Sequence, residues 1–164
     1  MSTALHAIPV PQQGARKGSG WIYLDAAAST VMDTSVVARV QQVSADLNAN
    51  PSSVHSGGVG ASMVIEEARQ VIVERLRCEP DELVFTSCAT ESNNLALKGV
   101  AAAPAYGQRR HIVTVRTEHK AVLDPCASLE AVGYEVTYLG VDGEGRLDVD
   151  ALADALRDDT LLVS

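Results

Sequence analysis

Residues 83–96 constrain the fold of this chain most, because an apolar run, a turn of small residues and a helix start follow one another there. The sequence LVFTSCATESNNLA predicts a buried strand that ends at Ser87 and a helix that starts at Thr90. The first N–H groups of such a helix lack intrahelical partners and, with the helix dipole, form an anion site, most often for phosphate. We therefore expect a phosphorylated ligand at this junction.

Two residues of this junction have alternative interpretations. The N–H groups of Ala89 and Thr90 and the Thr90 hydroxyl are candidates for binding phosphate oxygens, whereas the alternative is that Thr90 only caps its own helix. Cys88 suggests a nucleophile, because a helix N-terminus lowers the pKa of a thiol. No general base can be assigned to Cys88, however, and its alternative role is that of a small packing residue.

Composition limits the class of protein. Aromatic residues are only 4% of the 164 residues, so the core consists mainly of Val, Leu, Ile and Ala, which suits a helix-and-sheet protein better than a β-sandwich. The net charge of −8 argues against binding to nucleic acid. Cys78, Cys88 and Cys126 include no CxxC pair, so neither a disulfide framework nor a zinc site is indicated.

The sequence shows no sign of a membrane or secreted protein. No apolar run is long enough to span a membrane. Residues 1–20 are polar, contain Pro and Gly, and lack the apolar region of a signal peptide, so we interpret them as a flexible tail. We expect a cytoplasmic protein.

Apolar periodicity and capping residues predict alternating helices and strands. Besides the strand that ends at Ser87, we expect an extended segment at 21–24 and strands at 110–115, 135–139 and 160–164. Residues 48–60 contain Pro and three glycines and are expected to form a loop. The expected helices carry the following stripes and caps: Val36, Val40, Val43 and Leu47 after an Asp33 cap; Ile65, Ala68, Ile72 and Leu76; Thr90 through Val100; Val122, Cys126 and Leu129; Leu152 and Leu156 after an Asp148 cap.

This alternation predicts an α/β fold with a mainly parallel sheet and helices on both faces. Residues 117–120 follow the second complete strand, so His119 is expected at the same sheet edge as Thr90. Its imidazole can stack on a flat aromatic cofactor or move protons near neutral pH, while the alternative is an ordinary surface histidine. Residues 50–55 are either a lid or a plain polar loop.

Together these residues resemble the cysteine desulfurases, which are pyridoxal-phosphate enzymes of the class V aminotransferase group. The resemblance runs from Trp21 to Ser164, and its order and spacing are specific. The matching blocks are IYLD with AST, NPSS with His55, VFTS with ATES, TEHKAVLD, EVTYL and DDT. The EHKAVL block resembles the branch that serves iron–sulfur cluster and nitrogenase assembly.

The resemblance implies a fold, a cofactor and a reaction. It implies the type I aminotransferase-like fold, with residues 21–164 as an incomplete pyridoxal-phosphate-binding large domain, a homodimer, and transfer of sulfur from L-cysteine to leave L-alanine and an enzyme persulfide. It assigns the cofactor phosphate to Ala89 and Thr90, and the pyridine ring to His119. Cys88 stands where the family usually has Gly and is expected to crowd the phosphate turn, whereas Val31 in place of Pro is harmless.

The family also needs a lysine that binds the cofactor covalently, an Asp for the pyridine nitrogen and a loop cysteine that accepts sulfur. All three lie beyond the family's equivalent of Ser164, and Lys120 is not that lysine. We therefore expect an N-terminal portion without desulfurase activity of its own, whose strand ending at Ser87 lacks its neighbours. The alternatives are a non-catalytic partner of a full-length or split desulfurase, a pseudogene product, or another class V aminotransferase or lyase.

Overall fold

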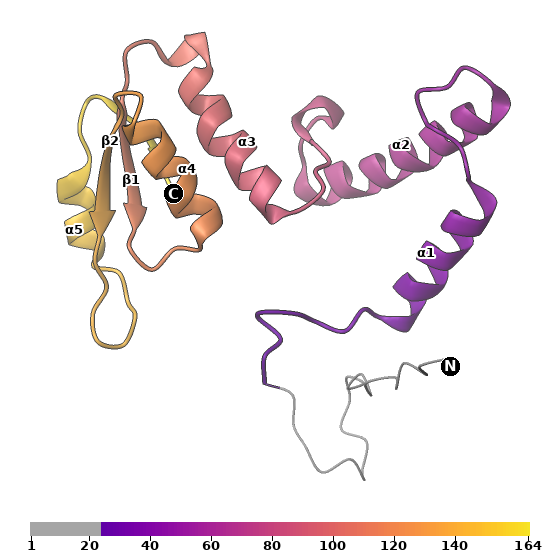
Figure 1. The fold of residues 1–164 in the computed structure, drawn as a ribbon, viewed down its shortest axis with the longest axis horizontal. Helices are drawn as coiled ribbons and strands as arrows, with labels where there is room; N and C mark the ends of the chain where they lie inside the picture. Colours follow the sequence, from indigo (N-terminus) through magenta and orange to yellow (C-terminus); the bar gives the residue numbers. More distant parts are fainter. Residues whose placement is uncertain (1–23) are drawn as a thin grey trace, which may run out of the picture. The chain divides into compact units, whose positions relative to one another are not determined.

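The computed structural model describes residues 24–164, which divide along the sequence into two units, one ending at Leu83 and the other starting at Val84 (Figure 1). Each unit is described by itself. The expected tail at 1–20, and the segment at 21–24 apart from Leu24, lie outside the described residues. The expectation that 21–164 form one incomplete domain stays a prediction.

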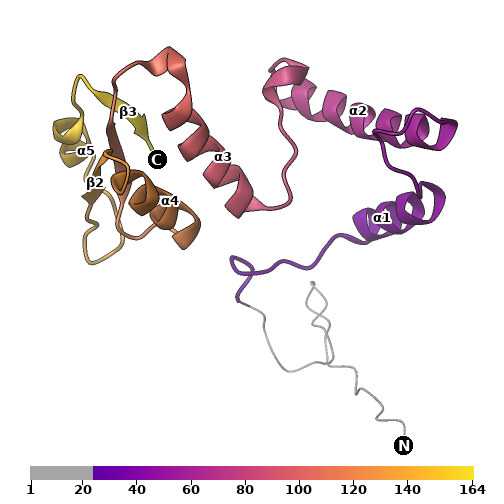
Figure 2. The same ribbon diagram turned by 45° about the horizontal axis from the view of Figure 1, so that its top comes forward.

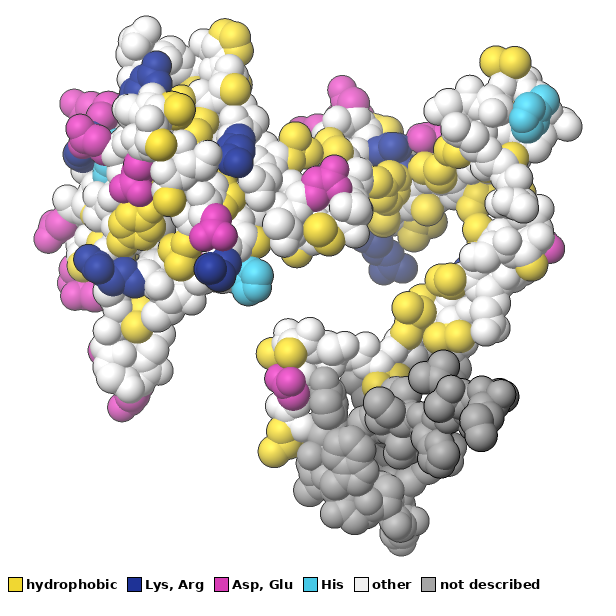
Figure 3. Space-filling model, in the orientation of Figure 1, with side chains coloured by type: hydrophobic (Ala, Val, Ile, Leu, Met, Phe, Trp, Pro, Cys, Tyr) yellow, Lys and Arg dark blue, Asp and Glu magenta, His cyan; other side chains and the backbone are white. Residues whose placement is uncertain are grey.

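The first unit contains two α-helices and a short 3₁₀ turn. Helix α1 spans Thr34–Asp46, α2 spans Ser56–Leu76, and the 3₁₀ turn spans Pro80–Glu82. The predicted cap of α1 is confirmed, since the Asp33 carboxylate accepts the Ser35 N–H at 2.8 Å. No residue of α1 is buried, and hydrophobic side chains lie along both helices in the space-filling view (Figure 3).

Two expectations for α2 are wrong. The helix begins at Ser56, inside the predicted loop, because the His55 side chain caps it by accepting the Gly58 N–H at 3.3 Å. The expected stripe from Ile65 to Leu76 is not the buried one, since the buried residues of α2 are Gly58, Ala61 and Val73. Close packing of Gly58 on the preceding turn therefore overrides the low helix propensity of glycine.

The second unit is a parallel α/β layer structure. Its elements are α3 (Ala89–Ala102), a 3₁₀ turn (Pro104–Tyr106), β1 (His111–Val115), α4 (Lys120–Glu130), β2 (Glu135–Leu139), α5 (Val149–Ala155) and β3 (Thr160–Val163). The sheet order is β2-β1-β3, and both pairings are parallel. The predicted strands at 110–115, 135–139 and 160–164 are thereby confirmed within a residue or two, and so is the α/β class.

Helices cover both faces of this sheet, as expected. The core joins Leu97 of α3 and Ile112 of β1 to the predicted inner stripe of α4, namely Val122, Cys126 and Leu129. Helix α5 lies on the other side of the sheet from α3 and α4 in both ribbon views (Figures 1 and 2). The Asp148 cap of α5 is confirmed, but Leu156, expected to point inward, is 50% exposed because α5 ends one residue earlier.

The strand predicted to end at Ser87 is absent from the second unit. Leu83 has an extended backbone, with φ −99° and ψ 119°, but residues 83–87 form no strand and Val84 is 61% exposed. Strand β1, to which α3 leads, is already paired on both edges by β2 and β3. The segment therefore cannot join the sheet beside β1, and extended backbone without a ladder does not count as a strand.

Candidate functional site

An open hollow of about 300 Å³ lies between α3 and α4 in the second unit. Its walls bring together two of the predicted site residues, Thr90 from the start of α3 and His119 from the end of the loop after β1. Ala89 immediately precedes Thr90 as the first residue of α3, but it does not line the hollow. The full lining is Thr90, Asn94, Lys98, His119, Lys120, Ala121, Asp124 and Pro125.

The first turn of α3 has open backbone donors. The helix begins at Ala89, one residue earlier than predicted, and its N-cap is Cys88, so the interpretation of Thr90 as the N-cap is wrong. The Cys88 side chain makes no capping hydrogen bond. The N–H groups of the first turn, including those of Ala89 and Thr90, are therefore placed to bind an anion.

Glu91 is also in this first turn, where its negative charge would oppose an anion. Its carboxylate instead accepts the N–H of Ser87 at 2.7 Å and the Ser87 hydroxyl at 2.6 Å. These bonds, the hydroxyl bond first, lower the pKa of Glu91 and hold its charge on the preceding turn. Glu91 does not line the hollow, so its negative charge does not lie on the side of α3 where Thr90 faces the hollow.

His119 caps α4 through its own side chain. Its Nδ1 accepts the Ala121 N–H at 3.0 Å, so a neutral ring carries its hydrogen on Nε2. The residue is exposed and lines the hollow. The interpretation as an ordinary surface histidine therefore omits its structural role, and the cap leaves one ring nitrogen and the ring faces available.

Cys88 is exposed, so its interpretation as a packing residue is wrong. The Glu91 N–H, followed by the Ser87 hydroxyl, lowers the pKa of its thiol. Cys126 behaves in the opposite way, because burial raises the pKa of its thiol in the core. Cys88 is the N-cap of α3 but does not line the hollow, so the expected crowding of the phosphate turn stays a prediction.

Several lining residues of the hollow were not predicted. Asn94 and Lys98 follow Thr90 at four-residue intervals and lie on the same side of α3. Asn94 also donates from Nδ2 to the Thr90 carbonyl at 3.0 Å, which stiffens the first turn. The four-residue spacing was visible in the sequence, but only the packing of α3 on α4 shows which side of the helix faces the site.

Among residues 24–164, no group of three or more His, Cys, Asp or Glu side chains is arranged to hold a metal ion. No helix in this range combines the length and the apolar character needed to cross a bilayer.

Comparison with known protein families supports the resemblance read from the motifs. The model of the aminotransferase class-V family matches residues 22–164. The chain is 46% identical over 143 residues to the cysteine desulfurase IscS of Dictyoglomus turgidum, and 49% identical over 147 residues to that of Pseudoalteromonas translucida. Each match covers 87% of this chain but only 36% of the relative, so the chain spans about a third of the length of these curated relatives.

Solved structures agree with the sequence matches. A "NifS-like protein" superposes with a TM-score of 0.75 at 37% identity, covering 83% of this chain and 37% of that one. DndA from Streptomyces lividans gives a TM-score of 0.72 at 44% identity, covering 87% and 40%. The fold prediction is thus confirmed over the part that is shared, and the chain belongs to the class V aminotransferase family, with similarity to the N-terminal part of cysteine desulfurases.

Proposed function

We propose that this chain provides the phosphate-binding turn and the ring-stacking histidine of a pyridoxal 5'-phosphate site in a cysteine desulfurase. The observation that carries the proposal is the hollow that Thr90 and His119 line together. The proposal includes a homodimer or a complex with a further polypeptide, L-cysteine as substrate, and iron–sulfur cluster or other sulfur-transfer assembly in the cytoplasm. The proposed oligomeric state, substrate and role in sulfur transfer are supported by the similarity to cysteine desulfurases over part of their length.

The first turn of α3 fits a phosphate monoester. The N–H groups of Ala89 and Thr90 lie in the first turn, where no side chain caps them, and the Thr90 hydroxyl lies on the wall of the hollow. A dianionic phosphate is favoured there by the positive end of the helix dipole. Cys88 precedes this turn where the family usually has glycine, and we propose that its side chain narrows the approach of the phosphate.

His119 fits the other part of the ligand. Because its Nδ1 is engaged with the Ala121 N–H, the ring is held in one orientation while Nε2 and the ring faces stay available. We propose that the imidazole stacks on the pyridine ring and that Nε2 gives or takes a proton near the substrate. When bound, pyridoxal phosphate supplies the electron-withdrawing ring that stabilises negative charge on the substrate.

A covalent bond to the cofactor requires a lysine with a suitable position and pKa. Lys98 and Lys120 line the hollow, but Lys120 directly follows the stacking residue His119, and Lys98 lies about two helical turns beyond Thr90. We therefore propose that the 164-residue chain by itself does not turn over L-cysteine.

The cofactor proposal is tested with pyridoxine 5'-phosphate, which lacks the aldehyde and cannot react with lysines. Titration followed by ¹H–¹⁵N NMR should shift the amides of Ala89 and Thr90 and the ring signals of His119. Pyridoxine without phosphate should leave the amides of Ala89 and Thr90 unshifted. Shifts scattered over the surface, or no binding in the millimolar range, would count against the proposal.

Substitution at the phosphate turn provides a matched comparison. Thr90→Val keeps the shape but removes the hydroxyl, and it should weaken binding of pyridoxine 5'-phosphate by about tenfold to a hundredfold, since a hydrogen bond to a charged group contributes about 1.5–3 kcal/mol. Thr117→Val, an equivalent change at an exposed threonine that does not line the hollow, should leave the affinity unchanged. Equal affinities of the two variants would remove Thr90 from the site.

The proposed lack of turnover is tested separately. Purified chain, pyridoxal phosphate and L-cysteine are incubated, and alanine is measured by mass spectrometry. The blank contains the same buffer, cofactor and L-cysteine without the protein. We expect no alanine above the blank. Formation of alanine that depends on both the chain and the cofactor would show that the chain is a complete enzyme.

A second candidate function is that of a non-catalytic partner. It is favoured by large hydrophobic side chains that are exposed on the described residues, such as Val54, Val71 and Val84. Co-expression with a polypeptide that carries the remaining two thirds of a cysteine desulfurase should then give a complex of fixed stoichiometry. A solitary, monodisperse chain under the same conditions would oppose this function.

A further inference from the structure

A small hydrogen-bond network holds the residues at the start of α3, and its centre is the backbone carbonyl of Cys88. As the N-cap residue, Cys88 accepts the Ser92 N–H through this carbonyl at 3.1 Å. The Ser92 hydroxyl lies 3.3 Å from the same oxygen, and the Thr86 hydroxyl lies 3.3 Å from it on the other side of Cys88 in the sequence. One peptide oxygen is thus contacted by a backbone donor and by two side chains.

The two hydroxyl groups also bind each other. Oγ1 of Thr86 and Oγ of Ser92 are 2.6 Å apart, so one hydroxyl hydrogen lies between them. Each hydroxyl has a single hydrogen, and the second one is left for the Cys88 carbonyl, whichever of the two residues supplies it. Either arrangement gives this carbonyl one hydroxyl donor besides the Ser92 N–H, which matches its two lone pairs.

The direction of this carbonyl determines the direction of the next N–H group. The peptide bond between Cys88 and Ala89 is trans, so the Cys88 oxygen and the Ala89 N–H point in opposite directions from one plane. The oxygen is turned toward Ser92 in α3, and the Ala89 N–H is therefore turned away from the helix. This is the direction in which the first N–H groups of a helix attract an anion.

The preceding peptide is fixed by a separate contact. The N–H and the hydroxyl of Ser87 both donate to Oε2 of Glu91, at 2.7 and 2.6 Å. Neither these bonds nor those to the Cys88 carbonyl use the N–H of Ala89 or of Thr90. The turn is thus held at two points, while both N–H groups proposed for phosphate stay available.

We propose that Thr86 and Ser92 are positioning residues of the phosphate turn, which orient the Ala89 N–H toward the phosphate by holding the Cys88 carbonyl. This inference rests on the proposed function, because it takes the phosphate monoester as the ligand. Neither Thr86 nor Ser92 lines the hollow, so both act through the peptide. The peptide is oriented before the ligand arrives, and binding does not have to supply the free energy of ordering it.

Removal of the two hydroxyls should weaken binding of the phosphate group selectively. Thr86→Val keeps the shape of the side chain, Ser92→Ala keeps the helix, and each leaves one hydroxyl that can donate to the Cys88 carbonyl. Each single variant should weaken binding of pyridoxine 5'-phosphate by about threefold or less, and the double variant by about tenfold. Binding of pyridoxine, followed through the ring signals of His119, should not change.

Conservative and control variants distinguish positioning from a general loss of structure. Thr86→Ser and Ser92→Thr keep both hydroxyls, so a chain with these two changes should bind like the unsubstituted chain. Ser128→Ala removes a hydroxyl from an exposed position of α4 outside the hollow and should have no effect. The inference is wrong if the chain without both hydroxyls keeps its affinity for pyridoxine 5'-phosphate, or if it loses affinity for pyridoxine by the same factor.

The ¹³C chemical shift of the Cys88 carbonyl tests the network without any ligand. The signal should move upfield when both hydroxyls are removed, because the carbonyl loses a donor, and it should stay in place in Ser128→Ala. If the unsubstituted chain does not bind pyridoxine 5'-phosphate, the proposed function fails and this inference fails with it. An unchanged carbonyl signal in a chain that does bind the phosphate overturns the positioning role alone.

Discussion

Thr114, in the middle of β1, carries a buried hydroxyl without a partner. The residue is 1% exposed, and its Oγ1 has no hydrogen-bond partner among the described residues. It lies on the same face of the sheet as Ile112 and opposite Tyr138 in the strand register. A buried hydroxyl that is left unsatisfied costs about 1–3 kcal/mol of stability.

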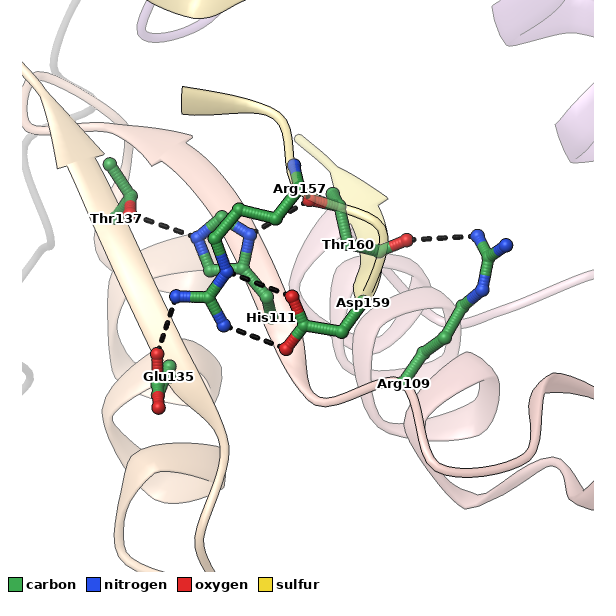
Figure 4. A network of polar contacts seen from close by, with 7 residues as sticks. All are labelled: Arg109, His111, Glu135, Thr137, Arg157, Asp159 and Thr160. Carbon is green, nitrogen blue, oxygen red and sulfur yellow. Dashed lines mark hydrogen bonds and ion pairs between the residues drawn. The ribbon is translucent and has the colours of Figure 1, made fainter. Parts of the chain in front are cut away.

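Thr114→Val should therefore stabilise the chain by about 1 kcal/mol, because the shape is kept and the unsatisfied oxygen is removed. Thr137→Val is the matched control, since its hydroxyl lies 2.9 Å from Nε2 of His111 (Figure 4) and its loss should destabilise the chain. The free energy of unfolding in urea distinguishes the two. Destabilisation by Thr114→Val would mean that the Thr114 hydroxyl has a partner in solution.

The exposed thiol of Cys88 and the buried thiol of Cys126 should also differ in reactivity. Cys88 is exposed and has a lowered thiol pKa, whereas Cys126 is buried and has a raised one. Because the thiolate is the nucleophile, iodoacetamide at pH 7 should modify Cys88 at least tenfold faster than Cys126. Peptide mass spectrometry over time gives both rates. Equal rates would show that the second unit opens on the timescale of labelling.

At the scale of elements, the start of α2 depends on one glycine. The preceding turn is closed by the Ser53 N–H, which donates to the Asn50 carbonyl at 2.9 Å. A Cβ on Gly58 would clash with the Ser53 carbonyl and come within 2.8 Å of the Asn50 carbonyl oxygen. Backbone atoms cannot move aside as a flexible side chain would, so only glycine fits at this position.

Gly58→Ala should therefore destabilise α2 by about 1–3 kcal/mol through overpacking. Gly60→Ala, two residues further along the same helix, meets only Leu47 Cδ2 at an ordinary 3.8 Å and should stabilise α2 by about 1 kcal/mol. Thermal unfolding followed by circular dichroism at 222 nm measures both changes. The prediction is wrong if both variants move the midpoint in the same direction.

Two apolar runs of the second unit show why one strand prediction succeeded and another failed. Strand β2 was predicted at its observed residues because its neighbour β1 is present to pair with it. The run before Ser87 has the same apolar character, yet it forms no strand because β1 is already paired on both edges. A strand depends on its partners, whereas the capped helices α1 and α5 depend mainly on local signals.

At the scale of the whole molecule, acid should destabilise the chain through four carboxylates with a lowered pKa. Each is stabilised first by one hydrogen bond: Asp33 by the Ser35 hydroxyl, Glu91 by the Ser87 hydroxyl, Asp142 by the Arg146 N–H and Asp159 by the Arg157 guanidinium.

A depressed carboxylate pKa contributes stability above the ordinary value, 4.5 for Glu and 3.8 for Asp, and loses it as the pH falls further. The melting temperature should thus fall steeply below about pH 4.5. Asp33→Asn keeps a side chain that caps α1 but cannot titrate. The melting temperature of this variant should therefore fall less steeply as the pH decreases. A melting temperature that stays constant from pH 5 to 3 would contradict this assignment.

The sequence by itself determined the family, most of the order of the elements, and Thr90 and His119 as candidate site residues. These follow from short-range information, namely caps such as Asp33 and Asp148, apolar periodicity, and the ordered motif blocks around Thr90 and His119. Local chemistry leaves its trace in local sequence, so this much can be read without coordinates.

Only the tertiary structure decided what these elements do for one another. It placed Thr90 and His119 on one hollow and assigned the cap of α3 to Cys88. It also buried His111 between two threonines that lie 26 and 49 residues further along the chain. Contacts over such separations are set by sheet order, packing and the available hydrogen-bond partners, and no local pattern records them.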